Sequence, residues 1–92
     1  MIPKSVLFYW SKGAEVRRSI IKFIHESNLQ NKPCFLNILS TTFKMSHTGM
    51  KKHIDLLTEE GFVILINPGG KPVYLKLTEK GQNILKELGI IL

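Results

Sequence analysis

Residues 46–64, SHTGMKKHIDLLTEEGFVI, combine a helix start, an apolar stripe and a helix stop in one short stretch. Ser46 suits an N-cap, because its hydroxyl can accept a hydrogen bond from a free amide of the first turn. Gly61 stands where helices commonly end, and a β-branched apolar run follows it. We therefore expect a helix over residues 46–60. Its apolar stripe, at helical spacing, consists of Met50, Ile54 and Leu57.

Apolar periodicity predicts further elements on both sides of this helix. The Gly-rich segment 67–71 separates two strand-like runs, which predicts a β-hairpin. The fold class is therefore α+β and mainly helical. The expected order is a helix at 11–27, a short strand at 34–36, a short helix ending near 44, the helix at 46–60, strands at 62–66 and 73–77, and a last helix capped by Thr78.

Composition limits the classes of function that the chain can serve. The 92 residues carry a formal net charge of +6 and are 43% hydrophobic, which fits a single domain, 1–92, with a polyanionic partner. The one cysteine, Cys34, excludes an internal disulfide and suits a reducing compartment. No apolar run is long enough to cross a bilayer, and no secretory signal is visible. We expect a cytoplasmic protein without a membrane partner.

No constellation of catalytic or metal-binding residues accompanies this charge. The three histidines, His25, His47 and His53, lack the spacing of metal ligands. His53 lies beside the apolar stripe, as a packed residue at the edge of a core does. No nucleophile elbow is present, and no glycine-rich phosphate loop follows a strand. The sequence therefore predicts no enzyme activity, no metal and no cofactor.

The order of these motifs resembles that of winged helix-turn-helix transcriptional regulators, especially the MarR-type, PadR-type and ArsR-type groups. The resemblance rests on residues 46–64 and on LTEKGQNIL at 77–85, and it spans about 12–88. It implies a three-helix core, a hairpin wing and a C-terminal helix. It also implies a sequence-specific regulator that binds double-stranded DNA, with residues 46–60 as recognition helix in the major groove. The build is similar to that of small proteins from archaea and their viruses.

The polar face of the predicted recognition helix is basic towards its start and acidic towards its end. Lys51 and Lys52 suit guanine acceptors or phosphates, whereas Asp55 either accepts from a cytosine amine or limits the approach of the helix. The wing tip, 67–71, suits a minor groove or a phosphate ridge. The candidate DNA contacts are Ser46, His47, Thr48, Lys51, Lys52, Asp55, Lys44, Gly69, Gly70, Lys71, Arg17 and Arg18.

Two other interpretations of the basic face stay open at this point. Exposed lysines are common on solvated helix faces, and a winged-helix domain can also serve as a protein–protein interaction module without DNA. In the second case the apolar termini carry the function and the lysines do not. Gly49, in the first turn of the predicted recognition helix, is explained by neither.

Both ends of the chain are apolar. Residues 6–10 and 90–92 lie outside the expected core, and a monomer must either expose them or fold them back. We expect them to pair across the two-fold axis of a homodimer that reads a pseudo-palindrome. Alternatively, residues 6–10 extend the first helix over its own core. The candidate dimer contacts are Phe8, Tyr9, Trp10, Ile90, Ile91 and Leu92.

Overall fold

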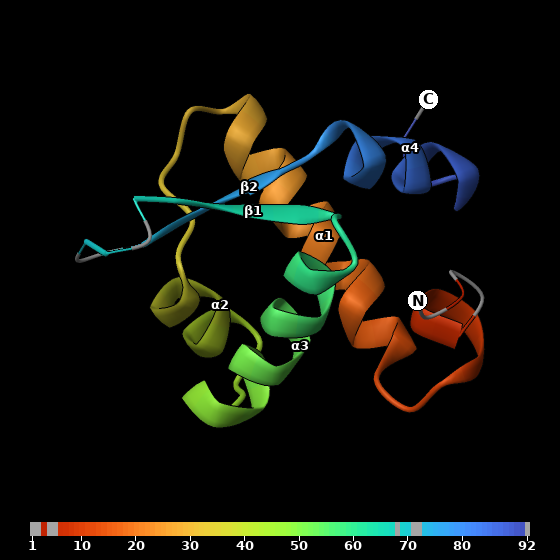
Figure 1. Cartoon of the computed structure of the whole chain (residues 1–92), viewed down its shortest axis with the longest axis horizontal. Coiled ribbons are helices and arrows are strands. Elements are labelled where there is room, and N and C mark those ends of the chain that lie inside the picture. Colours follow the sequence, from red (N-terminus) through yellow and green to blue (C-terminus); the bar gives the residue numbers. More distant parts are fainter. Residues whose placement is uncertain (1–2, 4–5, 68, 71–72, 92) are drawn as a thin grey trace.

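The computed structural model describes residues 3, 6–67, 69–70 and 73–91. It is an α+β structure in which helices pack around one two-stranded antiparallel hairpin (Figure 1). No helix in these ranges combines the length and apolar character needed to cross a membrane. The elements, in chain order, are the π-helical turn η1 (Val6–Trp10), α1 (Ala14–Leu29), α2 (Leu36–Thr42), α3 (His47–Glu59), β1 (Val63–Ile66), β2 (Tyr74–Leu77) and α4 (Glu79–Glu87).

Helix α3 forms where the opening stretch predicts it. Ser46 is the N-cap, and its Oγ accepts from the Gly49 amide at 3.0 Å. The helix ends at its C-cap Glu60, and Gly61 follows with a φ of 84°. A Cβ at Gly49 would lie 3.2 Å from Ser46 Oγ and 3.3 Å from Met45 Cγ. Gly49 therefore relieves a close contact with these two side chains at the start of the helix.

One apolar core joins the three long helices to the hairpin. Burying side chains of this size contributes about 1.5–3 kcal/mol each. Phe8 of η1 packs edge-on against Phe62, with ring centroids 5.2 Å apart. The core residues that α1, α3, the hairpin and α4 contribute include Ile20, Ile21, Ile24, Met50, Ile54, Leu57, Val63, Leu75, Leu77, Ile84 and Leu85.

Strand β2 has a neighbour on both of its edges. On one edge it pairs with β1, with Leu65 opposite Leu75. On the other edge Tyr74 forms a single bridge with Phe35, and the Leu75 amide donates to the Cys34 carbonyl at 2.8 Å. The strand predicted at 34–36 is therefore reduced to one bridge.

A side chain completes that second edge. Asn28 of α1 accepts from the Leu77 amide at 3.0 Å and donates to the Leu75 carbonyl at 3.4 Å. Its amide group makes the two bonds that a neighbouring strand would make. The end of α1 is therefore bonded directly to the hairpin.

Two helix boundaries differ from the predicted ones. The first helix begins at Ala14, not at 11, because Gly13 adopts a φ of 88° and turns the chain between η1 and α1. It continues past 27 to Leu29. The second helix ends at Thr42, before the predicted 44, because Lys44 adopts a φ of 53° that an α-helix does not contain.

The N-terminal segment does not continue the first helix, which was the alternative arrangement predicted for it. It is a separate turn folded back onto the core. Leu7 and Phe8 are buried, because their side chains fill the space beside Phe62. Only Tyr9 and Trp10 of the predicted N-terminal dimer contacts stay exposed, so the assignment of Phe8 to a dimer surface is wrong.

The C-terminal segment also packs against its own core. Ile90 and Ile91 are half-buried, and both amides donate to the Leu85 carbonyl, at 3.0 and 3.4 Å. Gly89, with a φ of 74°, allows the chain to turn back there. Leu92, the last predicted dimer contact, lies outside the described residues.

The joint between α4 and the hairpin yields a stability prediction. A Cβ at Gly81 would lie 2.4 Å from the backbone oxygen of Phe62, which cannot move aside as a side chain can. Gly81→Ala is expected to lower the free energy of unfolding by about 1–3 kcal/mol, measured from urea titrations. Gly69→Ala is the matched control, because no heavy atom lies within 4 Å of its Cβ position. Equal midpoints for both variants would contradict the close approach.

Candidate nucleic-acid interface

A tight turn between α2 and α3 presents the start of α3 to solvent. The left-handed Lys44 reverses the chain, and the Met45 amide donates to the Ser40 carbonyl at 3.0 Å. His47 Nε2 lies 3.3 Å from Asn37 Oδ1, which joins the two helices at the outside of the turn. Ser46, His47 and Thr48 are all exposed there.

The outer face of α3 lies opposite its buried stripe, as the helical wheel predicts. Lys51 Nζ lies 2.7 Å from Asp55 Oδ2, and the two side chains are 64% and 52% exposed. Lys52 and Lys44 are exposed and have no bonded partner in the part of the chain that the structure describes. The outer face of α3 thus carries one preformed ion pair and the solvent-exposed Lys52, and Lys44 is exposed in the turn before the helix.

The hairpin tip lies beyond the ends of the helices (Figure 1). Asn67 adopts a φ of 61°, and the Gly70 amide donates to its carbonyl at 2.8 Å. Gly69 is exposed and has open space around it. Lys71, also predicted as a contact of this tip, lies outside the described residues. Gly69 therefore offers bare backbone to any surface that approaches it.

Arg17 does not lie on this surface. Its side chain is buried, with 5% of the residue exposed, and its Nε donates to the Leu7 carbonyl at 2.7 Å. Nη2 donates to Ser11 Oγ, and Nη1 lies 3.4 Å from His53 Nδ1. The prediction that Arg17 contacts a flanking phosphate is wrong, because its guanidinium is buried and bonds groups within the protein.

Arg18 has a similar part in the fold. It is half-buried, and its Nη1 donates to the Phe8 carbonyl. The two arginines bond carbonyls of η1 and hold that turn against α1. Sequence pattern does not reveal this role, because a helical arginine has the same spacing whether it binds water, a phosphate or a carbonyl ten residues away.

His53 sits at the edge of the core, as predicted. Burial and then the charge of Arg17 lower the pKa of its imidazole. The packing is close, since a Cβ at Gly13 would lie 2.8 Å from His53 Cε1. His53 therefore belongs to the joint between η1, α1 and α3. The described residues contain no group of three or more His, Cys, Asp or Glu side chains that could hold a metal.

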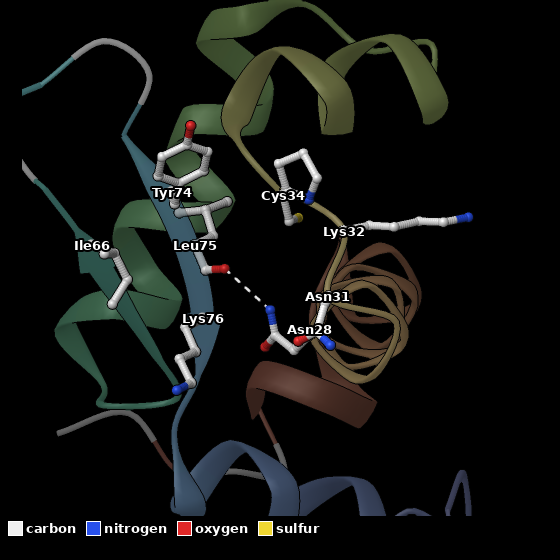
Figure 2. Close-up of a pocket in the computed structure, with 9 residues that line it drawn as sticks. Asn28, Asn31, Lys32, Cys34, Ile66, Tyr74, Leu75 and Lys76 are labelled. Atoms are coloured by element: carbon white, nitrogen blue, oxygen red, sulfur yellow. Dashed lines mark hydrogen bonds between the residues drawn. The ribbon is translucent and has the colours of Figure 1, made fainter.

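Two hollows flank the hairpin. The larger, of about 330 Å³, lies between the loop after α1 and strand β2 (Figure 2). Cys34 is buried beside it, and burial raises the pKa of its thiol to about 11, which makes it a poor nucleophile. Figure 2 shows Asn28 reaching across to the Leu75 carbonyl.

The smaller hollow, of about 210 Å³, lies between α3 and the hairpin. Its walls are mainly apolar, and the pair Lys51 and Asp55 lies at its polar side. Sequence periodicity cannot find such a hollow, because its walls come from segments far apart in the chain. Those apolar walls are Leu36, Ile54, Leu65, Val73 and Leu75.

Comparison with known proteins identifies a shared fold. No protein-family model matches the chain, and no curated protein does. The chain is similar to the crystal structure of AF1382 from Archaeoglobus fulgidus, with a TM-score of 0.71 and 20% sequence identity. The match covers 82% of this chain and 81% of that one. At this identity the likeness concerns the arrangement of helices and strands alone.

The position of His53 predicts how stability depends on pH. Its pKa is lower in the folded chain than in the unfolded chain, where it is about 6.5. The unfolded chain therefore binds the proton more readily, and this contribution to stability is complete above about pH 6.5 and is lost as the pH falls. Urea midpoints are expected to fall between pH 7.5 and 5.5, and His53→Gln is expected to flatten that slope. An unchanged slope in the variant would contradict the assignment.

Proposed function

We propose that this chain is a winged helix-turn-helix protein that binds double-stranded DNA and regulates transcription. The observation that carries the proposal is the exposed, serine-capped α3 with Lys51 and Lys52, held beside a projecting hairpin. The order of α1, the Phe35 bridge, α2, α3 and the hairpin agrees with that architecture. The net charge of +6 suits a polyanionic partner.

In this proposal the N-terminal half of α3 enters the major groove. Thr48 and Lys52 face outward from the first turns and reach base edges or phosphates. The Ser46 hydroxyl is already bonded to the Gly49 amide, so the neighbouring free amides of the first turn are the groups that meet a phosphate. Lys44, in the turn, faces the flanking backbone.

The hairpin is the wing of this proposal. Gly69 has no side chain to keep the backbone away from a phosphate ridge or a minor groove, and no heavy atom lies within 4 Å of its Cβ position. The Gly70 amide donates to the Asn67 carbonyl, and this bond shapes the tip. In this proposal the backbone at Gly69 contacts the duplex, and α3 supplies side chains that reach base edges.

A second copy of the chain is the proposed protein partner. Trp10 is 80% exposed and Tyr9 is 55% exposed, which is unusual for side chains of this size. Bonds from Ser11, Arg17 and Arg18 to the carbonyls of Val6, Leu7 and Phe8 hold the backbone of η1, which carries both aromatics, against α1. Large exposed aromatics of this kind are common anchors of protein interfaces. A two-fold pair through η1 supplies two recognition helices.

A second candidate function is protein–protein interaction without DNA, and the exposure of Trp10 is the observation that favours it. The two candidates differ in their response to salt, since only DNA binding releases condensed counterions. For the regulator, the logarithm of duplex affinity falls linearly with the logarithm of salt concentration. A chain that binds no duplex at low salt would support the second candidate.

The DNA proposal predicts the effect of removing the two lysines of α3. Lys51→Ala with Lys52→Ala is expected to weaken duplex binding by about tenfold or more, measured by fluorescence anisotropy. The matched control removes two exposed lysines from other helices, Lys22 and Lys86, and is expected to have a much smaller effect. Equal losses in both double variants would indicate general charge attraction without a reading face.

The dimer proposal predicts a change of mass. Sedimentation equilibrium at tens of micromolar is expected to give a dimer for the natural chain and a monomer for Trp10→Ser. Leu29→Ser is the control, because Leu29 is 70% exposed at the far end of α1. A monomeric natural chain would contradict the proposal, and so would a Trp10 variant that stays dimeric.

A further inference from the structure

We propose that Lys51 and Asp55 act together as one reading unit that selects a G·C base pair. The inference rests on the proposed DNA binding and specifies what α3 recognises. Its basis is the contact between Lys51 Nζ and Asp55 Oδ2, 2.7 Å apart on the outer face of α3. The two residues are one helical turn apart, so their heads reach the same place beyond the helix.

The spacing of the two heads matches the major-groove edge of one base pair. In a G·C pair the cytosine N4 amine donates to guanine O6, so these atoms lie about 2.9 Å apart. The second N4 proton and the remaining lone pairs of O6 and N7 point into the groove. The donor and acceptor of Lys51 and Asp55, 2.7 Å apart, can therefore meet O6 and N4 side by side.

The ion pair does not have to break for this contact. The Lys51 ammonium has three protons, of which Asp55 takes one, and two are left for guanine O6 and N7. The Asp55 carboxylate has lone pairs left to accept the N4 proton. Each charged head thus keeps its partner while it binds the base, which limits the cost of removing water from both.

The A·T pair offers a poorer match to the same two heads. Its edge runs from the adenine N7 acceptor through the N6 donor to the thymine O4 acceptor and the methyl group. A carboxylate opposite N6 then has a repelling acceptor on each side. Lys51 can then reach only one acceptor, either N7 or O4, whereas guanine offers it the two adjacent acceptors O6 and N7. The wrong pair leaves a desolvated carboxylate without a full set of partners.

The charge balance of α3 supports a selective role over simple attraction. Lys51 and Lys52 on the outer face are offset by Asp55 and Glu59, so this face adds no net positive charge. Attraction to phosphate must come from other lysines, including Lys44. A carboxylate at a surface that binds a polyanion weakens the affinity for every duplex, unless a base amine donates a hydrogen bond to it. In this proposal Asp55 therefore discriminates between duplexes that place a base amine opposite it and duplexes that do not.

The test begins with the selection of duplexes by the natural chain from a random pool. We expect one position in each half-site to be held as G·C. Replacing that pair by A·T is expected to weaken binding by about tenfold. The ratio of the affinity for the G·C duplex to the affinity for the A·T duplex measures this preference. Asp55→Ala and Lys51→Ala are each expected to reduce the ratio to near one. The double variant is expected to lose no more of the preference than either single variant.

The matched control is Glu26→Ala on α1. Glu26 pairs with Lys22 at the same spacing along the chain, at 3.9 Å, with side chains 53% and 56% exposed. Its removal changes the net charge equally and is expected to leave the G·C ratio unchanged. Since all four side chains are exposed, thermal unfolding is expected to show intact folds.

Each result decides the inference. A G·C ratio that survives Asp55→Ala overturns it, and so does a variant that binds all duplexes more tightly by one common factor. A selection that holds no position as G·C overturns it while DNA binding itself stands. A natural chain that binds no duplex overturns the proposed function together with this inference, and that outcome is recognisable before any variant is made.

Discussion

The guanidinium of Arg17 joins three parts of the molecule that the chain separates. Its Nε bonds the Leu7 carbonyl of η1, and its Nη1 approaches His53 of α3. A buried cation is costly unless its donors are bonded, so the residue stays buried only while η1 is in place. Phe8 can pack against Phe62 because the carbonyls of its own turn are bonded in this way. The N-terminal turn and α3 therefore share one polar joint.

The second joint fixes the hairpin. Asn28 satisfies the β2 edge next to α1, and the Cys34 carbonyl extends the same edge towards α2. At the other end, Gly81 lets α4 approach the backbone of Phe62. The hairpin is thus held by helices at both ends, although it has only two strands, which would be marginal alone.

Local chemistry predicted the elements well. The Ser46 cap, the Gly61 stop and the Thr78 cap each depend on a few neighbouring residues, and all three form as expected. The wrong predictions, for Phe8 and Arg17, concern residues whose surroundings are set by long-range contacts. The burial of Phe8 depends on Phe62, and the role of Arg17 depends on carbonyls of another segment, which no periodicity records.

In the candidate site, too, local features could be predicted from the sequence and side-chain contacts could not. The exposed face of α3 follows from the helical wheel, so Lys51, Lys52 and Asp55 lie where the sequence puts them. The contact between Lys51 and Asp55 needed side-chain geometry, because spacing alone allows an ion pair without requiring one. The reason for a glycine at position 49 is also a matter of side-chain geometry, because a Cβ there would lie close to Ser46 Oγ and Met45 Cγ.

The Asn28 amide has one more consequence, for the shape of the proposed DNA complex. Because it ties β2 to the end of α1, the hairpin cannot swing away from the helices without losing two hydrogen bonds. The angle between the wing and α3 is then a property of the protein and not of the duplex. Duplexes that bend easily between the two contact points bind at a lower elastic cost than stiff ones. In the proposed complex, a single asparagine thereby makes the flexibility of base steps that the protein never touches part of the recognition.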